Sequence, residues 1–179
     1  MPFDPAAYGA EVASILALDG DGERLIALVQ SAPPHPEARP ALDALAASRR
    51  IPESAMAGLY LYFSFWNEAL EIAQSIDSAE GSFWHAIVHR QEPDAGNSAY
   101  WFRRVGAHPV FSGLRERAAA LGFDRGARWD PMAFTEFCEQ AHRSPGSQAE
   151  RTAQEVQRAE WQLLFDYCAS RGAAKSGRA

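Results

Sequence analysis

The chain has 179 residues, 47% of them hydrophobic, and its 23 acidic and 17 basic residues give a formal net charge of −6. This length is enough to bury one substantial core and too short to suggest a second domain. The negative net charge gives the chain no broad basic surface for nucleic acid or anionic lipid, so any anion site must be local. We therefore expect one domain over residues 1–171, with no nucleic-acid or membrane partner, and a disordered tail over 172–179.

Membrane and secretion signals are weak. The longest nearly unbroken apolar run, residues 55–66, is well short of the roughly 20 residues that a membrane helix needs. Asp4 stands where a signal peptide carries basic residues. Cys138 and Cys168 form no CxxC pair, which favours buried free thiols over a disulfide. We expect a cytoplasmic protein.

Helix-start signals recur along the chain. In the segments 3–8 and 129–134, an aspartate cap precedes a proline, and apolar residues flank the cap at stapling distance. The segments 77–80 and 147–150 have the pattern of a capping box. Hydrophobic spacing then predicts helices near residues 5–18, 23–31, 38–49, 52–62, 65–76, 78–91, 97–105, 111–121, 130–143 and 147–171.

Two segments modify this all-helical pattern. Four prolines in residues 31–40 predict an extended connector inside the domain. Residues 59–63 have strand propensity, but their context favours a helix.

Residues 58–73 are echoed about thirty residues later by 86–103, which resembles helix pairs of the tetratricopeptide or Sel1-like kind. Two units fall short of the three that a solenoid needs, so we expect an all-α, compact orthogonal bundle with tetratricopeptide-like pairs.

Residues 84–111 (WHAIVHRQEPDAGNSAYWFRRVGAHPVF) hold three of the five histidines, three arginines and five aromatic residues. Imidazole, guanidinium, carboxylate and amide groups beside large rings are typical of a ligand pocket. On a helix, His85, His89 and Glu92 share one stripe because they follow one another at i, i+4 and i+7. These three residues are a candidate metal set for zinc or iron, with Asp94 or His108 as further ligands. Ala86 stands where HExxH carries its glutamate, which weighs against a metal.

The remaining candidates have structural alternatives. Arg90 falls on the apolar side of its helix, so either an ion pair or ligand recognition must compensate its charge. Asn97 is a candidate helix cap. Tyr100, Trp101 and Phe102 are consecutive and point to different sides, so we expect at least one ring in the core and another at a cavity or interface. Arg103 and Arg104 differ by about 100° around the helix, so we expect one to reach the site.

His108 precedes Pro109 in an extended turn, and a loop histidine beside a pocket is a good acid or base candidate.

The run W-H-x3-H-R-x-E-x-D-x2-N-x2-Y-W-F-R-R-V-G-x-H-P, from Trp84 to Pro109, resembles the hallmark of an uncharacterised family of small helical proteins from bacteria and fungi. The likeness extends from about Ala57 to Phe123. It implies membership without a mechanism. The positions it carries over as a presumed site are the histidines, Arg90, Glu92, Asp94, Asn97 and Tyr100.

Two functions from different classes remain open. In the first, a helical binding module recognises a small polar or anionic ligand, or a partner peptide. Its ligand-binding residues are His85, His89, Arg90, Glu92, Asp94, Asn97, Tyr100, Arg103 and His108. In the second, a metal on His85 and His89 activates water, and Glu92, Asp94 or His108 moves the proton in a hydrolase or isomerase reaction. We favour binding, because no third metal ligand is secure.

Overall fold

A computed structural model describes the backbone of residues 2–176 and the side chains of residues 2–170. Within these residues all regular structure is helical, which confirms the predicted fold class. The α-helices are α1 (Ala10–Leu16), α2 (Arg39–Ser48), α3 (Glu53–Tyr62), α4 (Trp66–Ser75), α5 (Ala79–Gln91), α6 (Ala95–Val105), α7 (Val110–Ala120), α8 (Pro131–His142) and α9 (Gln148–Ser176). Three 3-10 helices are η1 (Pro5–Tyr8), η2 (Ala17–Gly22) and η3 (Pro36–Ala38).

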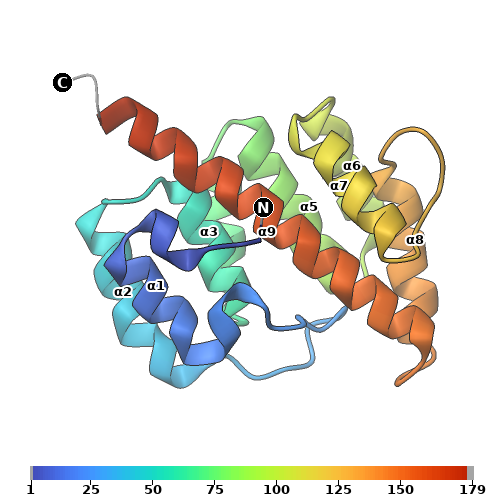
Figure 1. The fold of residues 1–179 in the computed structure, drawn as a ribbon, viewed down its shortest axis with the longest axis horizontal. Helices are drawn as coiled ribbons and strands as arrows, with labels where there is room; N and C mark the ends of the chain where they lie inside the picture. The colour runs from blue at the N-terminus through green and yellow to red at the C-terminus, as the bar shows by residue number, and fades with distance from the viewer. Residues whose placement is uncertain (1, 177–179) are drawn as a thin grey trace.

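The long helix α9 crosses the molecule diagonally (Figure 1). It packs against α3, α7 and α8, while α3, α4, α5 and α6 pack on one another in succession. The amino-terminal helices α1 and α2 lie at one end, and α6, α7 and α8 form the other (Figure 1). The helices form a compact bundle, and tetratricopeptide-like pairing within it stays a prediction.

Local capping explains where several helices begin. The Asp4 side chain accepts from the Ala6 N–H at 3.0 Å, and the Phe3 and Tyr8 rings that flank the cap lie 5.6 Å apart. Asp130 caps α8 by accepting from two backbone N–H groups. Ser78 and Ser147 cap α5 and α9 through their hydroxyl groups. All four helix starts marked in the sequence are therefore confirmed.

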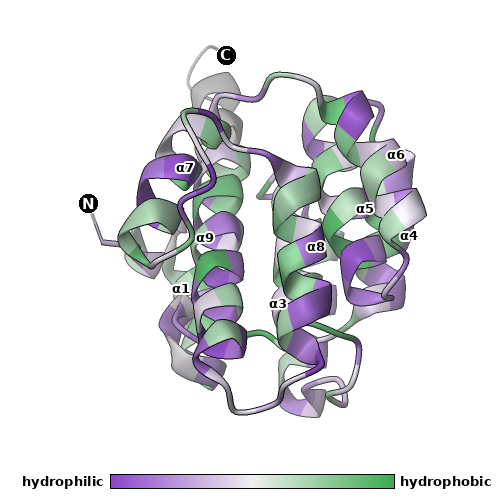
Figure 2. Cartoon of the chain, turned by 90° about the vertical axis from the view of Figure 1, so that its right-hand side faces the viewer, coloured by the Kyte–Doolittle hydropathy of each residue, from purple (hydrophilic) through white to green (hydrophobic). Residues whose placement is uncertain are grey.

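The core is built of large aromatic side chains around α3, α5 and α9. Trp84, Trp161 and Phe165 are almost fully buried. Gly58 on α3 permits this packing, because a Cβ there would lie 2.8 Å from the Trp84 ring and 3.2 Å from Phe165. The Trp161 indole N–H donates to the Gly58 carbonyl at 2.8 Å. Hydrophobic and hydrophilic residues alternate around α9, as expected for a helix that buries one face in the core (Figure 2).

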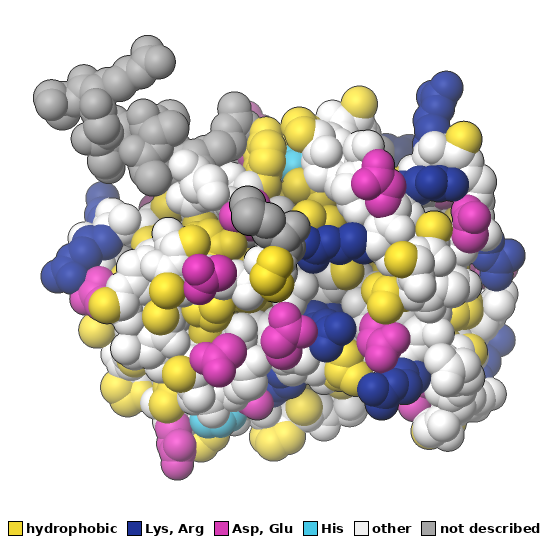
Figure 3. Space-filling model, viewed as in Figure 1, with side chains coloured by type: hydrophobic (Ala, Val, Ile, Leu, Met, Phe, Trp, Pro, Cys, Tyr) yellow, Lys and Arg dark blue, Asp and Glu magenta, His cyan; other side chains and the backbone are white. Residues whose placement is uncertain are grey.

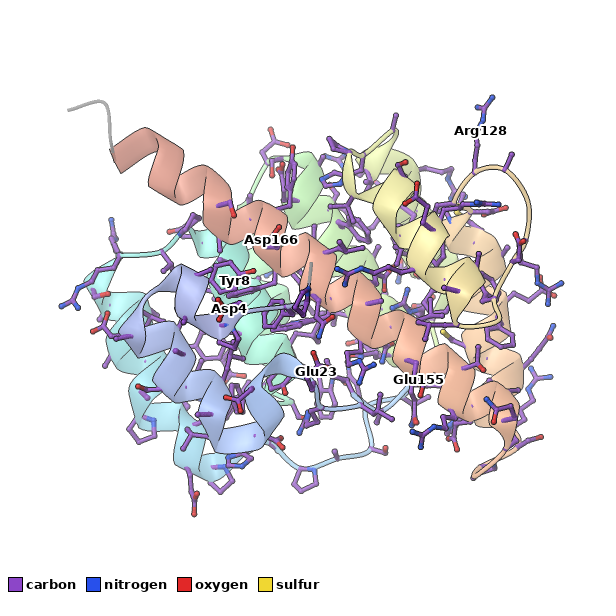
Figure 4. The ribbon with its side chains drawn as sticks, viewed as in Figure 1. Asp4, Tyr8, Glu23, Arg128, Glu155 and Asp166 are labelled. Atoms are coloured by element: carbon purple, nitrogen blue, oxygen red, sulfur yellow. The ribbon has the colours of Figure 1, made fainter. Side chains whose placement is uncertain are left out.

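The amino-terminal segment is fastened to α9. The Tyr8 hydroxyl donates to Asp166 Oδ1 at 2.9 Å (Figure 4), and the Phe3 ring lies 5.4 Å from that of Trp161. Gly9, with φ +98°, separates η1 from α1, so the single helix predicted over 5–18 is interrupted.

The helix predicted over residues 23–31 is wrong, because this segment is irregular. Buried glutamines take the carbonyl groups that an α-helix would use internally. Gln157 on α9 donates to the Ile26 and Ala27 carbonyls at 3.0 and 3.2 Å, and Gln91 on α5 donates to Ala27 at 3.3 Å. Tertiary hydrogen bonds therefore overrule a local helical pattern.

Cys138 and Cys168 are buried and form no disulfide among the described residues, as predicted. Helix α9 continues to Ser176, while residues 177–179 lie outside the described residues, so the disordered tail stays a prediction. Over the described residues, no helix is long and apolar enough to cross a membrane.

Candidate functional site

The nine side chains predicted to form one pocket are spread over separate parts of the structure. Arg90 reaches α9, whereas His85 reaches Trp101 on α6. Arg103 and His108 line a groove beside α7. The whole set, in chain order, is His85, His89, Arg90, Glu92, Asp94, Asn97, Tyr100, Arg103 and His108.

The histidine stripe on α5 is stacked on α6. The His85 ring lies 3.8 Å from the Trp101 ring, with 17° between the planes, and 4.8 Å from His89, with 27°. His89 Nδ1 is 2.7 Å from Glu92 Oε2, and the Arg104 guanidinium lies 5.2 Å from the Trp101 ring centre. The helical spacing predicted this stripe, and its rings are used in packing between the two helices.

Burial controls the charge of His85. The residue is 5% exposed, and its Nδ1 has no hydrogen-bond partner among the residues with described side chains. Desolvation, together with the neighbouring His89, lowers the pKa of His85 to about 4, so the ring is neutral at pH 7. Among the described residues, no group of three or more His, Cys, Asp or Glu side chains could hold a metal ion. A zinc or iron site on His85, His89 and Glu92 thus has no three-ligand group to support it.

Arg90 is the centre of a buried polar network. Its side chain is fully buried and binds both carboxylate oxygens of Glu160, at 3.2 and 2.5 Å. It also donates to Gln157 at 3.3 Å, and its guanidinium lies 4.8 Å from the Phe134 ring centre. Burial, the largest single influence, lowers the pKa of Arg90, but the Glu160 carboxylate and the neighbouring Cys138 together outweigh this effect and keep that pKa above its ordinary value. Of the two alternatives for Arg90, the structure contains the ion pair.

A small cavity of about 250 Å³ adjoins this network, between the 28–29 loop, the end of α5 and α8. Arg90, Cys138 and Glu139 are among its walls. Burial raises the pKa of the Cys138 thiol to about 12, so the thiol is protonated and a poor nucleophile at neutral pH.

The first turn of α6 accounts for two further candidates. Asp94, not Asn97, caps the helix: its Oδ1 accepts from the Asn97 N–H at 3.0 Å, and its Oδ2 accepts from the Asn97 side-chain amide at 2.7 Å. These two hydrogen bonds from Asn97 lower the pKa of Asp94. Tyr100, one turn further, is 48% exposed. Asp94 and Asn97 therefore organise the helix start, and Tyr100 points outward.

Arg103 and His108 belong to an open groove of about 670 Å³ at the α6, α7 and α8 end of the molecule, called here the α6–α7 groove. Residues 102–103, 106–108, 111–112, 115–116, 127–129 and 131–132 line it. Phe111 and Met132 supply apolar surface, whereas Phe102 is only 2% exposed. Arg103 and Arg104 are both exposed, but only Arg103 is among the groove residues.

His108 forms part of a groove wall. It is 7% exposed, with its ring 4.8 Å from Tyr167 and 5.4 Å from Phe83. Its Nδ1 accepts from the Val110 N–H at 3.3 Å. Aromatic neighbours and the start of α7 therefore fix the ring in place.

Two arginines and a tryptophan that line the groove have N–H groups without an acceptor among the described residues. Arg103 and Arg128 form no hydrogen bond or ion pair with any described residue, and Arg128 projects outward from the loop before α8 (Figure 4). Trp129 is 8% exposed, and its indole N–H has no acceptor in the described part of the chain. A buried donor without an acceptor costs free energy, which an acceptor on a ligand or a water molecule would recover.

Arg115 fastens the loop that forms one wall of the groove. Its Nε donates to the Gly126 carbonyl at 3.0 Å, and its guanidinium lies 3.6 Å from Asp124. Glu116, the next residue, also lines the groove and has no partner among the residues with described side chains. Arg115 therefore holds the loop in place, and Glu116, the next residue in the sequence, is a carboxylate with no partner among the described side chains.

Sequence reasoning missed Arg115, Glu116, Arg128 and Trp129 as site residues. A usable signal was present: residues 103–130 hold six arginines and three carboxylates in a chain whose net charge is −6. Arginine side chains gather over the right-hand half of the face that includes α7 and α8 (Figure 3). The positive charge that the whole chain lacks is present locally.

Comparison with protein-family models, with curated proteins and with solved structures finds no significant match to this chain.

Proposed function

We propose that this protein is a helical binding module whose α6–α7 groove takes a small ligand with a negatively charged group and an apolar body. The observation that carries the proposal is the pair of guanidinium groups of Arg103 and Arg128, which have no partner among the described residues and line one cavity of about 670 Å³. Pockets that bind small molecules combine mostly apolar walls with a few polar groups that fix orientation.

Electrostatics supports an anion in this groove. A guanidinium beside low-dielectric aromatic walls attracts an anion more strongly than one in open solvent, because field lines concentrate there. Arg103 is free to pair with a ligand, since no described carboxylate holds it. Arg128, at the outer edge, adds to the attraction.

The apolar walls favour a ligand with a hydrophobic body. Phe102 and Phe111 lie on the two helices that flank the groove, and Met132 is 40% exposed there. Covering such surface stabilises a complex by about 25 cal/mol per Å² of apolar area removed from water, before the costs of association. Inorganic anions have no apolar body, so they would gain no stabilisation from covering these walls.

Two matched fluorescent probes test the proposal. The first is 8-anilinonaphthalene-1-sulfonate, and the second is N-phenyl-1-naphthylamine, which has the same rings without the sulfonate. We expect the sulfonate to bind with measurable affinity and Arg103→Ala to weaken it about tenfold, the loss of one charge-assisted hydrogen bond. Binding of the uncharged probe should change less than twofold.

A charge-matched control removes an arginine elsewhere. Arg50, which pairs with Glu11 near the other end of the molecule, should be replaceable by alanine without effect on either probe. Binding should also weaken as sodium chloride is raised, because ions screen the attraction. Equal loss of sulfonate binding in Arg50→Ala and Arg103→Ala would mean that the groove is not the binding site.

A further inference from the structure

We infer that the α6–α7 groove prefers monoanionic carboxylates with an apolar chain over phosphate monoesters, and that Glu116 is the residue that sets this preference. The inference rests on the proposed function, since it assumes that the groove binds amphipathic anions. It adds a ligand class and a specificity-determining residue.

The charges that line the groove leave room for about one negative charge. Arg103 and Arg128 have no described partner, but Arg115 already shares its charge with Asp124 at 3.6 Å. Glu116 adds a free carboxylate to the same lining. Two unpaired cations and one unpaired anion suit a ligand with a single negative charge.

A phosphate monoester fits this balance poorly. It carries between one and two negative charges near neutral pH and approaches two at pH 8, because its second pKa is about 6. Because Glu116 already offsets one of the two arginines, Arg103 and Arg128, no net positive charge remains for the second charge of the phosphate. Specificity is often obtained through such repulsion of the wrong ligand as much as through attraction of the right one.

A carboxylate matches the donors that are available. The planar guanidinium of Arg103 presents paired N–H groups whose spacing fits the two oxygens of a carboxylate. The alkyl chain of the ligand would cover Phe111 and Met132. Removing this apolar surface from water would add to the binding free energy of the carboxylate ligand.

Displacement of 8-anilinonaphthalene-1-sulfonate at pH 8 tests the inference with decanoate, decyl phosphate and decan-1-ol, each below its micelle concentration. The three compounds share one alkyl chain and differ in head-group charge. We expect decanoate to displace the probe at least fivefold more effectively than decyl phosphate, with decan-1-ol weaker than decanoate.

The decisive variant is Glu116→Gln, an exposed change that keeps the side-chain shape. In this variant, decyl phosphate should displace the probe about fivefold more effectively, because the second charge of the phosphate no longer meets a carboxylate. Displacement by decanoate should change less than twofold. Glu37→Gln, an exposed carboxylate outside the groove, is the matched control and should change neither.

The outcomes separate the two proposals. Equal or better displacement by decyl phosphate in the unmodified protein would overturn the carboxylate preference while leaving the groove as an anion site. An unchanged preference in Glu116→Gln would overturn the role of Glu116. Failure of all three compounds to displace the probe would overturn the proposed function as well.

Discussion

Arg90 and Arg103 come from the same arginine-rich stretch of sequence, yet the fold treats them in opposite ways. Arg90 is fully buried, paired with Glu160 and bonded to Gln157. Arg103 is exposed at the edge of a groove and has no partner among the described residues. The first arginine connects α5 to α9, and the second is available to a ligand.

The comparison shows how to separate structural polar groups from functional ones. A buried charge must be compensated by the protein itself, because the cost of leaving it unpaired is several kcal/mol. Once compensated, it has little capacity left to bind anything else. Polar groups that have no partner among the described residues and line a cavity, such as the Arg103 guanidinium, are the better guide to a binding site.

The largest expected effect comes from breaking the Arg90 ion pair. Glu160→Met leaves a buried guanidinium without its carboxylate, which should lower the free energy of unfolding by about 3–5 kcal/mol. Urea unfolding followed by circular dichroism measures this loss.

The double variant Arg90→Met/Glu160→Met is the control for that experiment. Replacing a whole buried pair by apolar side chains removes the desolvation cost along with the attraction, so stability should return to within about 2 kcal/mol of the unmodified protein. If the double variant were as unstable as Glu160→Met, the comparison with Arg103 would fail, because Arg90 would then matter through more than charge compensation.

A second, smaller effect concerns His85 and pH. Its pKa in the fold, about 4, is below the unfolded value of 6.5, so the unfolded chain binds more protons between these pH values. Stability is therefore full above pH 6.5 and falls as pH drops toward 4. At pH 5 the loss attributable to His85 should be about 2 kcal/mol.

His85→Phe isolates this contribution, because phenylalanine can keep the contact with Trp101 and cannot be protonated. The variant should lose about 2 kcal/mol less than the unmodified protein between pH 7 and pH 5, measured by urea unfolding at each pH. The exposed His142→Asn is the control and should leave the pH dependence unchanged. Parallel pH profiles for His85→Phe and the unmodified protein would show that burial does not hold this ring neutral.

Much of the fold could be predicted from local chemistry. Asp4, Asp130, Ser78 and Ser147 mark helix starts through hydrogen bonds to residues two or three positions away, which a sequence displays directly. The segment 23–31 could not be predicted in this way. Its carbonyls are bound by Gln91 and by Gln157, which are more than sixty residues away in the chain.

In the candidate site, too, local features could be predicted and contacts between distant residues could not. Helical spacing correctly placed His85 and His89 together, because both lie on one helix. It could not show that Arg90 meets Glu160, seventy residues later, or that Trp129 lies beside the groove with Arg103. Which polar groups remain unmatched depends on tertiary contacts that no local pattern encodes.

The smallest expected effect on stability is that of Arg103. Arg103→Ala should change the free energy of unfolding by less than about 0.5 kcal/mol, because the side chain is exposed and contributes no described hydrogen bond. Arg90→Ala, measured beside it by urea unfolding, should cost several kcal/mol, since Glu160 is left buried without its partner. Two alanine substitutions thirteen residues apart would then differ about tenfold in their effect on folding. A loss above about 1 kcal/mol for Arg103→Ala would mean that the fold also uses this arginine, and the distinction between structural and available charge would no longer hold here.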